Sequence, residues 1–269
     1  MKEQVNFGNV SQDYARYRDE LPARLADWLE THGALKTGAQ AVDLGAGTGS
    51  FSRLLAGRGA AVIGVELSAE MIGEARRIAD DIDSSVVYVQ APAEATELPA
   101  GLFDLATAAR AWHWFDRQQT ISEVRRLLKP GGTLAVVDSV ILAAESEAAR
   151  ATFELIRRQM PDGKLKAPGA MAESTERRNG FPLGWFDEWA EGGFQEKDSG
   201  QFGYELRFTP DAWRGKVRSI SWFSQLDTES RQQVDQEMAE LFRDVTELTI
   251  PHRCSFVLLQ KEDRPPARL

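Results

Sequence analysis

Residues 41–50 read Ala-Val-Asp-Leu-Gly-Ala-Gly-Thr-Gly-Ser. The apolar start predicts a buried strand, and the alternate glycines predict a tight turn that opens into a helix. Gly45, Gly47 and Gly49 lack the Cβ atoms that would keep a ligand away from backbone N–H groups. The N-terminal end of the following helix adds a positive dipole at the same place. We therefore expect a small cofactor to bind at this turn.

The glycine spacing argues against two other nucleotide-binding motifs. A dinucleotide fingerprint has the order Gly-x-Gly-x-x-Gly, whereas here the third glycine is Gly49 and the next residue is Ser50. No Gly-Lys-Ser/Thr follows, so the turn is not a phosphate-binding P-loop. An acidic residue, Asp43, precedes the turn in its strand. The glycine spacing therefore disfavours a nicotinamide-dependent oxidoreductase.

A second acidic residue ends the next predicted strand. The run at 61–66 is mostly apolar and ends at Glu66, 23 residues after Asp43. A carboxylate at this place can accept hydrogen bonds from both hydroxyls of a ribose, as in other open α/β sheets. Ser68 is expected to cap the helix that follows, with Met71 facing inward. The turn and Glu66 together favour a nucleoside-containing cofactor.

The motifs, taken in order, resemble those of the class I S-adenosylmethionine-dependent methyltransferases. His113-Trp114-Phe115 is typical of the type-11-like subgroup, which acts on small molecules. The resemblance covers about residues 10–140, and the matching segments are 42–50, 62–68, the loop at 92–99, 103–116 and 123–137.

This resemblance implies a Rossmann-like, doubly wound α/β fold. Its mostly parallel sheet has seven strands, and a helical lid is inserted after the fifth. The alternation of strands and helices from Gln40 to Val137 agrees with such a sheet, and Pro130-Gly131-Gly132 predicts a turn before the fifth strand. The implied regions are N-terminal cap helices at 1–35, the cofactor-binding core at 36–140, the acceptor-site lid at 141–195 and the remaining strands and helix at 196–269.

The same resemblance implies that the cofactor is S-adenosylmethionine and the product S-adenosylhomocysteine. Pro92 departs from the family, because many relatives carry Asp there to bind the adenine amino group. The implied cofactor contacts are the backbone of Gly45, Ala46 and Gly47 at the methionyl part and ribose, Glu66 at the ribose hydroxyls, Leu67 on adenine, the peptide groups of Ala93 and Glu94 at the adenine edge, and Ala109 at the methionyl part. Asp43 and Met71 are also counted among the cofactor-binding residues. In the cap, Tyr14 would close over the cofactor and Arg18 would pair its carboxylate, unless this segment is an ordinary exposed helix with charged residues.

Arg110 is a second departure, since relatives with His-Trp-Phe usually carry Gln or Asn there. An arginine at the end of the fourth strand could hold an anionic acceptor with two parallel hydrogen bonds. It could equally form a salt bridge with Asp116 or Glu94. Both interpretations remain open.

His113 and Trp112 complete the catalytic candidates. His113 could act as a general base, or it could be a packed structural residue. Trp112 could line a flat acceptor pocket together with Trp185 and Trp189, or the three could belong to the core. Methyl transfer is an in-line displacement that proximity and orientation accelerate, so no fixed catalytic constellation is required.

Composition limits the partners. The 269 residues carry a net charge of −9, which disfavours nucleic acid. The single cysteine, Cys254, lies in an apolar run and is expected to be a core residue. No apolar run reaches transmembrane length, and the three histidines (His32, His113 and His252) are too scattered for a metal site. A cytoplasmic, metal-independent monomer or homodimer with no membrane contact is expected.

The favoured function is transfer of a methyl group to an oxygen or nitrogen atom of a small planar or anionic metabolite. One alternative is a regulatory protein that binds S-adenosylmethionine without catalysis. Another is a methyltransferase for a protein or an RNA, although the acidic charge disfavours RNA.

Overall fold

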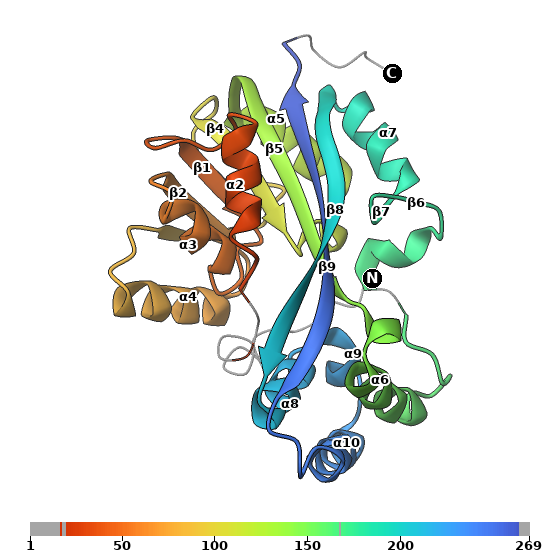
Figure 1. The fold of residues 1–269 in the computed structure, drawn as a ribbon. Coiled ribbons are helices and arrows are strands. Elements are labelled where there is room, and N and C mark those ends of the chain that lie inside the picture. The colour runs from red at the N-terminus through yellow and green to blue at the C-terminus, as the bar shows by residue number, and fades with distance from the viewer. Residues whose placement is uncertain (1–16, 18–19, 167, 264–269) are drawn as a thin grey trace. The chain divides into compact units, whose positions relative to one another are not determined.

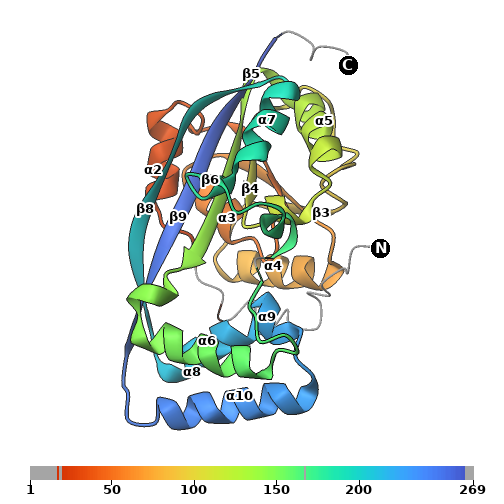
Figure 2. The ribbon, with the colours of Figure 1, turned by 90° about the vertical axis from the view of Figure 1, so that its right-hand side faces the viewer.

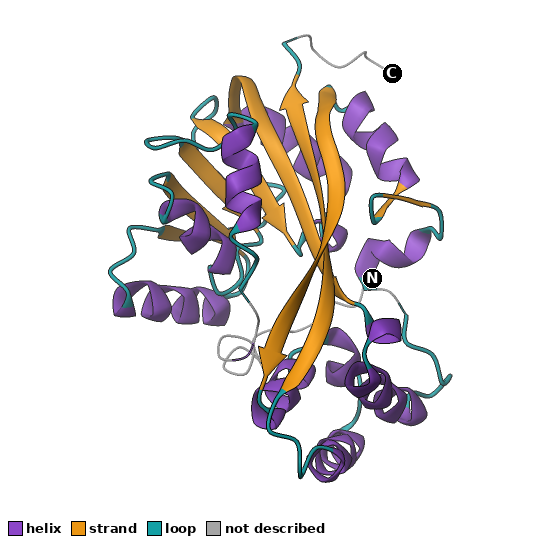
Figure 3. Cartoon of the chain, viewed as in Figure 1, coloured by secondary structure: helices purple, strands orange, loops and turns teal. Residues whose placement is uncertain are grey.

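The computed structural model describes residues 17, 20–166 and 168–263, and it contains a seven-stranded sheet (Figure 1). The pairs β1–β2, β2–β3, β1–β4 and β4–β5 are parallel. The arrows show that β9 runs opposite to β5 and β8 (Figure 3). The predicted fold class is thereby confirmed. Across the sheet the order is β3 (Val87–Gln90), β2 (Ala61–Glu66), β1 (Gln40–Leu44), β4 (Phe103–Ala109), β5 (Leu128–Ile141), β9 (Leu248–Lys261) and β8 (Phe194–Phe208).

Side chains cap several of the helices. The Met71 N–H donates to Ser68 Oγ at 3.3 Å, as the sequence predicts for this helix start. Asp116 accepts from the Gln119 N–H at the next such start, over 3.2 Å. The helices are α2 (Arg24–Thr31), α3 (Ser50–Ala56), α4 (Ala69–Asp81), α5 (Arg117–Leu127), α6 (Glu147–Gln159), α7 (Leu183–Glu191), α8 (Pro210–Arg218), α9 (Ser221–Ser224) and α10 (Thr228–Leu241), with short 3₁₀ turns η2 (Trp112–Trp114), η3 (Ala143–Glu145) and η4 (Gly169–Glu173).

Residues 20–138, 169–201 and 255–263 form one compact unit, here called the sheet unit. Helix α2 lies on one face of its sheet, and α5 and α7 lie on the other (Figure 2). The central strands are covered on both faces, which explains why β1 and β4 are buried along nearly their whole length. A short antiparallel pair, β6 (Arg177–Arg178) with β7 (Phe181–Pro182), precedes α7.

The described residues of 139–168 and 202–254, with Tyr17, form a second compact unit, here called the helical unit. Its core includes Trp213, Val234 and Met238, all at most 1% exposed. The Trp213 Nε1–H donates to Thr152 Oγ1 on α6 at 3.0 Å. No helix in the described part of the chain is both long and apolar enough to cross a membrane.

The predicted lid at 141–195 is divided between these units after residue 168. Its second part, from η4 to α7, packs within the sheet unit. A Cβ on Gly169 would lie 2.4 Å from the carbonyl oxygen of His113, so η4 touches the turn that follows β4. Closure of this region over an acceptor stays a prediction.

The predicted turn at Pro130-Gly131-Gly132 is a bulge inside β5. The pairing with β4 shifts from Phe103↔Leu128 to Leu105↔Thr133. Gly131 has a φ of +69°, which glycine adopts without strain. The extra residues therefore leave the ladder without ending the strand.

Candidate functional site

The glycine turn between β1 and α3 uses the left-handed backbone region. The φ angles of Gly45, Gly47 and Gly49 are +66°, +57° and +82°. A Cβ on Gly45 would lie 2.7 Å from the Cβ of Ala111 and 3.0 Å from the ring of Phe115. The segment after β4 therefore packs directly on the turn, and this close approach within the protein requires Gly45.

The third glycine of the turn is required by a side chain from β3. A Cβ on Gly49 would lie 1.9 Å from the hydroxyl of Tyr88, and one on Gly64 would lie 2.7 Å from the same ring. Tyr88 is 3% exposed, so it cannot move aside without opening the core. The spacing predicts room for a ligand at all three glycines, whereas at Gly49 the Tyr88 hydroxyl takes that space.

Glu66 ties the turn to the end of β2. Its carboxylate accepts from the Gly47 N–H at 2.9 Å, the Leu67 N–H at 2.9 Å and the Ser68 N–H at 3.0 Å. A carboxylate offers about four acceptor positions, so capacity remains for a ligand hydroxyl. The apolar Leu67 side chain beside it is 52% exposed. A hydroxyl acceptor next to open apolar surface suits a nucleoside.

The loop after β3 begins beside Glu66, because the Ala91 N–H donates to the Glu66 carbonyl oxygen at 3.1 Å. Ala93 is buried, at 6% exposed. The Glu94 side chain forms a hydrogen bond within the protein, because its Oε1 accepts from the Asp116 N–H at 2.8 Å. Only the peptide groups of Ala93 and Glu94 are assigned to a ligand by the resemblance, and the Glu94 contact leaves those groups available.

Arg110 follows the last residue of β4, Ala109, in a strained conformation. Its φ is +57°, in the region that residues with a Cβ rarely adopt. The Arg110 N–H donates to the Val137 carbonyl oxygen at 2.7 Å, which holds the start of the turn after β4 against β5. Such strain costs on the order of 1–3 kcal/mol and is typical of ligand-binding sites. Neither predicted role of Arg110 is decided by this geometry.

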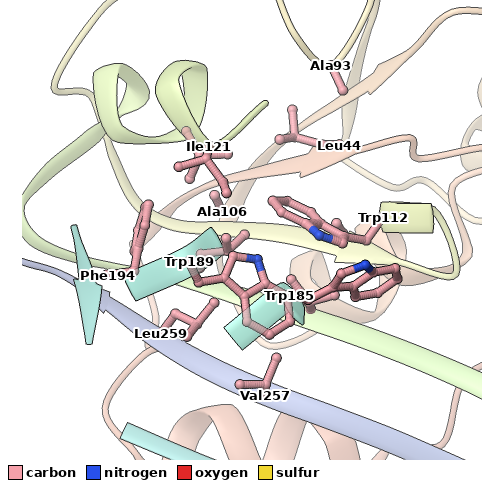
Figure 4. Close-up of a cluster of buried hydrophobic side chains, with 14 of the residues drawn as sticks. Leu44, Ala93, Ala106, Trp112, Ile121, Trp185, Trp189, Phe194, Val257 and Leu259 are labelled. Carbon is pink, nitrogen blue, oxygen red and sulfur yellow. The ribbon is translucent and has the colours of Figure 1, made fainter. Parts of the chain in front are cut away.

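Trp112 and His113 lie in η2, where they are 1% and 8% exposed. The Trp112 ring packs 5.9 Å from that of Trp189 on α7, and the two lie in one aromatic cluster with Trp185 (Figure 4). Among the described residues, no hydrogen-bond partner is found for the indole N–H of Trp112, Trp185 or Trp189. The cluster is part of the core and also carries three buried donors.

Asp43 lies beneath the turn and is 1% exposed. Its carboxyl group accepts from Ser52 Oγ on α3 at 2.6 Å and from Thr107 Oγ1 on β4 at 2.7 Å. Burial raises the pKa of Asp43 to about 6, although the two hydroxyl hydrogen bonds act in the opposite direction. Asp43 therefore joins three elements from within and does not face the open side of the turn.

The structure brings most of the remaining predicted contacts to the carboxyl ends of β1, β2 and β4, the edge where open α/β sheets bind ligands. Met71 is buried on α4, at 4% exposed. Tyr14 and Arg18 lie outside the described residues. In the described part of the chain no three side chains of metal-ligating type come together.

Sequence patterns missed three residues that shape the site. Ala111 and Phe115 contact Gly45, and Tyr88 fills the space beside Gly49. Phe115 stands in the His-Trp-Phe motif, which could have drawn attention to it. Ala111 and Tyr88 carry no comparable signal, because their role depends on contacts between distant strands.

Comparisons with known proteins agree with this geometry. The sequence profile of a family described as a methyltransferase domain matches residues 42–136. A malonyl-[acyl-carrier protein] O-methyltransferase of Enterobacter lignolyticus is 38% identical over 141 residues, which are 52% of this chain and 53% of that protein. An uncharacterised methyltransferase of Mycobacterium tuberculosis H37Rv is 35% identical over 133 residues, 49% of this chain and 51% of that protein.

The chain thus spans about half the length of the curated relatives it matches. Among solved structures, a chain of Anaeromyxobacter dehalogenans described as a type II methyltransferase matches with a TM-score of 0.62 and 24% identity. That match covers 93% of this chain and 99% of the other, and it supports the fold. Residues 42–136, which include the glycine turn, Glu66 and the end of β4, thus match the family described as a methyltransferase domain.

Proposed function

We propose that this protein transfers a methyl group from S-adenosylmethionine to an oxygen or nitrogen atom of a small metabolite. The observation that carries the proposal is the Glu66 carboxylate. It is bound to the Gly47 N–H at 2.9 Å, it keeps acceptor capacity, and it stands beside the exposed Leu67. These features support recognition of the adenosyl part at the ends of β1 and β2.

The chemistry asks for positioning above all. Bound S-adenosylmethionine supplies an electrophilic methyl group on a positive sulfur. Charge disperses as the methyl group moves, so an oriented acceptor in a water-poor site gains most of the acceleration from proximity. In this proposal the glycine turn and Glu66 orient the cofactor, the segment at 109–115 faces the acceptor, and no metal ion takes part.

Two observations support an acceptor that carries carboxylate or carbonyl oxygens. The indole N–H groups of Trp112, Trp185 and Trp189 can only donate, and each unmet buried donor costs about 1–3 kcal/mol. Arg110, at the end of β4, supplies a planar donor fork. This acceptor class is tested by competition, in which small carboxylic acids and the matching neutral amides are compared as inhibitors of methyl transfer. Equal inhibition by an acid and its amide would count against the class.

His113 is proposed as a general base for an acceptor that is protonated at working pH. It is 8% exposed and lies three residues beyond Arg110 in the turn after β4. Turnover of the wild type should then fall at low pH, where protonation of the imidazole removes the base, and His113→Asn should lack this limb of the pH profile. A His113→Asn variant with the same pH profile as the wild type would leave His113 a purely structural role.

The proposed activity is tested with the wild-type chain in two steps. Calorimetric titration with S-adenosylhomocysteine should give saturable 1:1 binding, and absence of binding overturns the proposal. A panel of small carboxylates, phenols and heteroaromatic amines is then assayed for S-adenosylhomocysteine formation. Binding without turnover on any small molecule would favour the regulatory alternative, while turnover only on a protein or an RNA would favour a macromolecular acceptor.

Replacing Arg110 by alanine is expected to raise the KM for the acceptor found in that panel about 10-fold, the equivalent of one lost charged contact of roughly 1.4 kcal/mol. The affinity for S-adenosylhomocysteine should stay the same. Arg77→Ala, at an exposed position on α4, is the control for loss of one positive charge. An equal loss of acceptor and cofactor binding in Arg110→Ala would show a structural role, such as a salt bridge.

A further inference from the structure

The loop between β3 and β4 holds a strained residue between two fixed neighbours. Glu97 has a φ of +59°, although it carries a side chain and is exposed. On one side, Thr96 is 1% exposed. On the other side, the Leu98 carbonyl oxygen accepts from Arg126 on α5 at 2.7 Å. Strain of this kind persists only where the surroundings hold the backbone on both sides.

Glu123 on α5 is the centre of this arrangement. Its Oε1 accepts from the Thr96 N–H at 2.9 Å and from Thr96 Oγ1 at 2.6 Å. Arg126 donates to both carboxylate oxygens at 2.7 Å. These hydrogen bonds, led by those from Arg126, lower the pKa of Glu123 to about 2 despite its burial. The carboxylate is therefore ionised throughout the range of working pH.

The same loop is also attached to the other end of α5. Glu94 accepts from the Asp116 N–H, which precedes the first turn of this helix. Helix α5 thus holds the loop at Glu94, at Thr96 and at Leu98. The peptide groups of residues 93 and 94 lie just after the end of β3 and at the first of these attachments. Their position is therefore set by β3 on one side and by α5 on the other.

We propose that Glu123 and Arg126 are positioning residues that fix the loop backbone at 93–94 and thereby set how tightly and how selectively the purine of the cofactor is bound. The inference rests on the proposed function, in which that backbone meets the adenine edge. Backbone groups select a base by the positions of their hydrogen-bond donors and acceptors. A shift of this backbone by a few tenths of an ångström therefore weakens the binding of adenine more than the binding of a base that already fits poorly.

The test compares Glu123→Gln with the wild type by calorimetry. The ligands are S-adenosylhomocysteine and its analogue in which hypoxanthine replaces adenine. In Glu123→Gln we expect S-adenosylhomocysteine to bind about 10-fold more weakly and the preference for adenine over hypoxanthine to fall by a similar factor, as for one lost charged hydrogen bond. Hydrogen exchange at the Thr96 and Leu98 amides should accelerate.

Asp104→Asn is a matched control in the same unit. The Asp104 carboxylate also accepts from a backbone N–H, that of Gln40 at 2.9 Å, and from a basic side chain, Lys129, at 2.9 Å. Neither of these two partners lies in the loop between β3 and β4. The variant should keep the adenine preference even where it lowers the melting temperature.

Three outcomes overturn the proposal. In the first, folded Glu123→Gln keeps the wild-type preference for adenine over hypoxanthine. In the second, Asp104→Asn loses as much of this preference as Glu123→Gln, and in the third the wild type binds S-adenosylhomocysteine and its hypoxanthine analogue equally. Should Glu123→Gln fail to fold, Thr96→Val removes one hydrogen bond to Glu123, and Thr96→Ser retains it and must rescue the preference. Failure of the wild type to bind S-adenosylhomocysteine at all would instead refute the proposed function.

Discussion

Replacing Glu66 by alanine is expected to weaken the binding of S-adenosylhomocysteine about 100-fold, the equivalent of roughly 2.7 kcal/mol for a lost charged hydrogen bond together with the loosened turn. The change acts in two ways. It removes the acceptor for the ribose hydroxyls, and it leaves the Gly47, Leu67 and Ser68 N–H groups without the carboxylate that holds them now. Isothermal titration of the purified variant measures the loss.

Two further variants separate these effects. Glu66→Gln keeps one acceptor oxygen but turns an amide donor toward a backbone N–H, so its loss should be intermediate, about 10-fold. Glu70→Gln changes the same charge four residues away, where the carboxylate accepts from Ser68 Oγ at 2.6 Å, and should bind normally. Normal binding by Glu66→Ala would remove the main support for a cofactor at this place.

Asp43 is expected to give the folded protein a stability that falls as pH rises from about 4 to about 7. Its pKa is 3.8 as an ordinary carboxyl and about 6 in the folded protein, where burial disfavours the charge. Between these values the folded chain keeps a proton that the unfolded chain has lost. The contribution, about 3 kcal/mol for a shift of this size, is therefore fully present below the lower pKa and lost as pH passes the upper one.

The measurement is denaturant unfolding of the wild type and Asp43→Asn at pH 4, 5, 6 and 7. The difference in free energy of unfolding should change by about 2 kcal/mol across this range, in favour of Asp43→Asn at the higher pH. Asp104→Asn should show almost no change over this range, because hydrogen bonds from Lys129 and the Gln40 N–H outweigh burial and lower the pKa of Asp104 below its ordinary 3.8, so that its contribution is lost only at pH values below that. A pH-independent difference for Asp43→Asn would refute the assignment.

Local patterns predict the central strands because each of these strands has a recognisable run of residues in the sequence. Runs of small and branched apolar residues end at Glu66 and Ala109, and the structure ends β2 and β4 at these residues. The helix start at Ser68 follows from the same local chemistry. The identity of the cofactor follows from the family resemblance and not from local patterns. The glycine turn lies within the matched segment, which spans only 95 residues.

Other features depend on contacts that no local pattern reports. Glu123 and Thr96 are 27 positions apart, and nothing in the spacing pairs an acidic helix residue with a loop threonine. The apparent turn at Gly131 became a bulge because β4 continues beside it. The division of 141–195 arises because η4 and α7 bury Met171, Trp185 and Trp189 in the core of the sheet unit.

The ring of Tyr88 has a consequence for the evolution of this fold. It occupies the space beside Gly49 and Gly64 at once, so the three positions form one coupled set. A larger residue at Gly64 becomes tolerable only after the aromatic residue on β3 has become small, whereas Gly49, with its φ of +82°, stays favoured as glycine even when the ring is lost. Surviving sequences should therefore change at Tyr88 and Gly64 together, in an order that starts at the tyrosine.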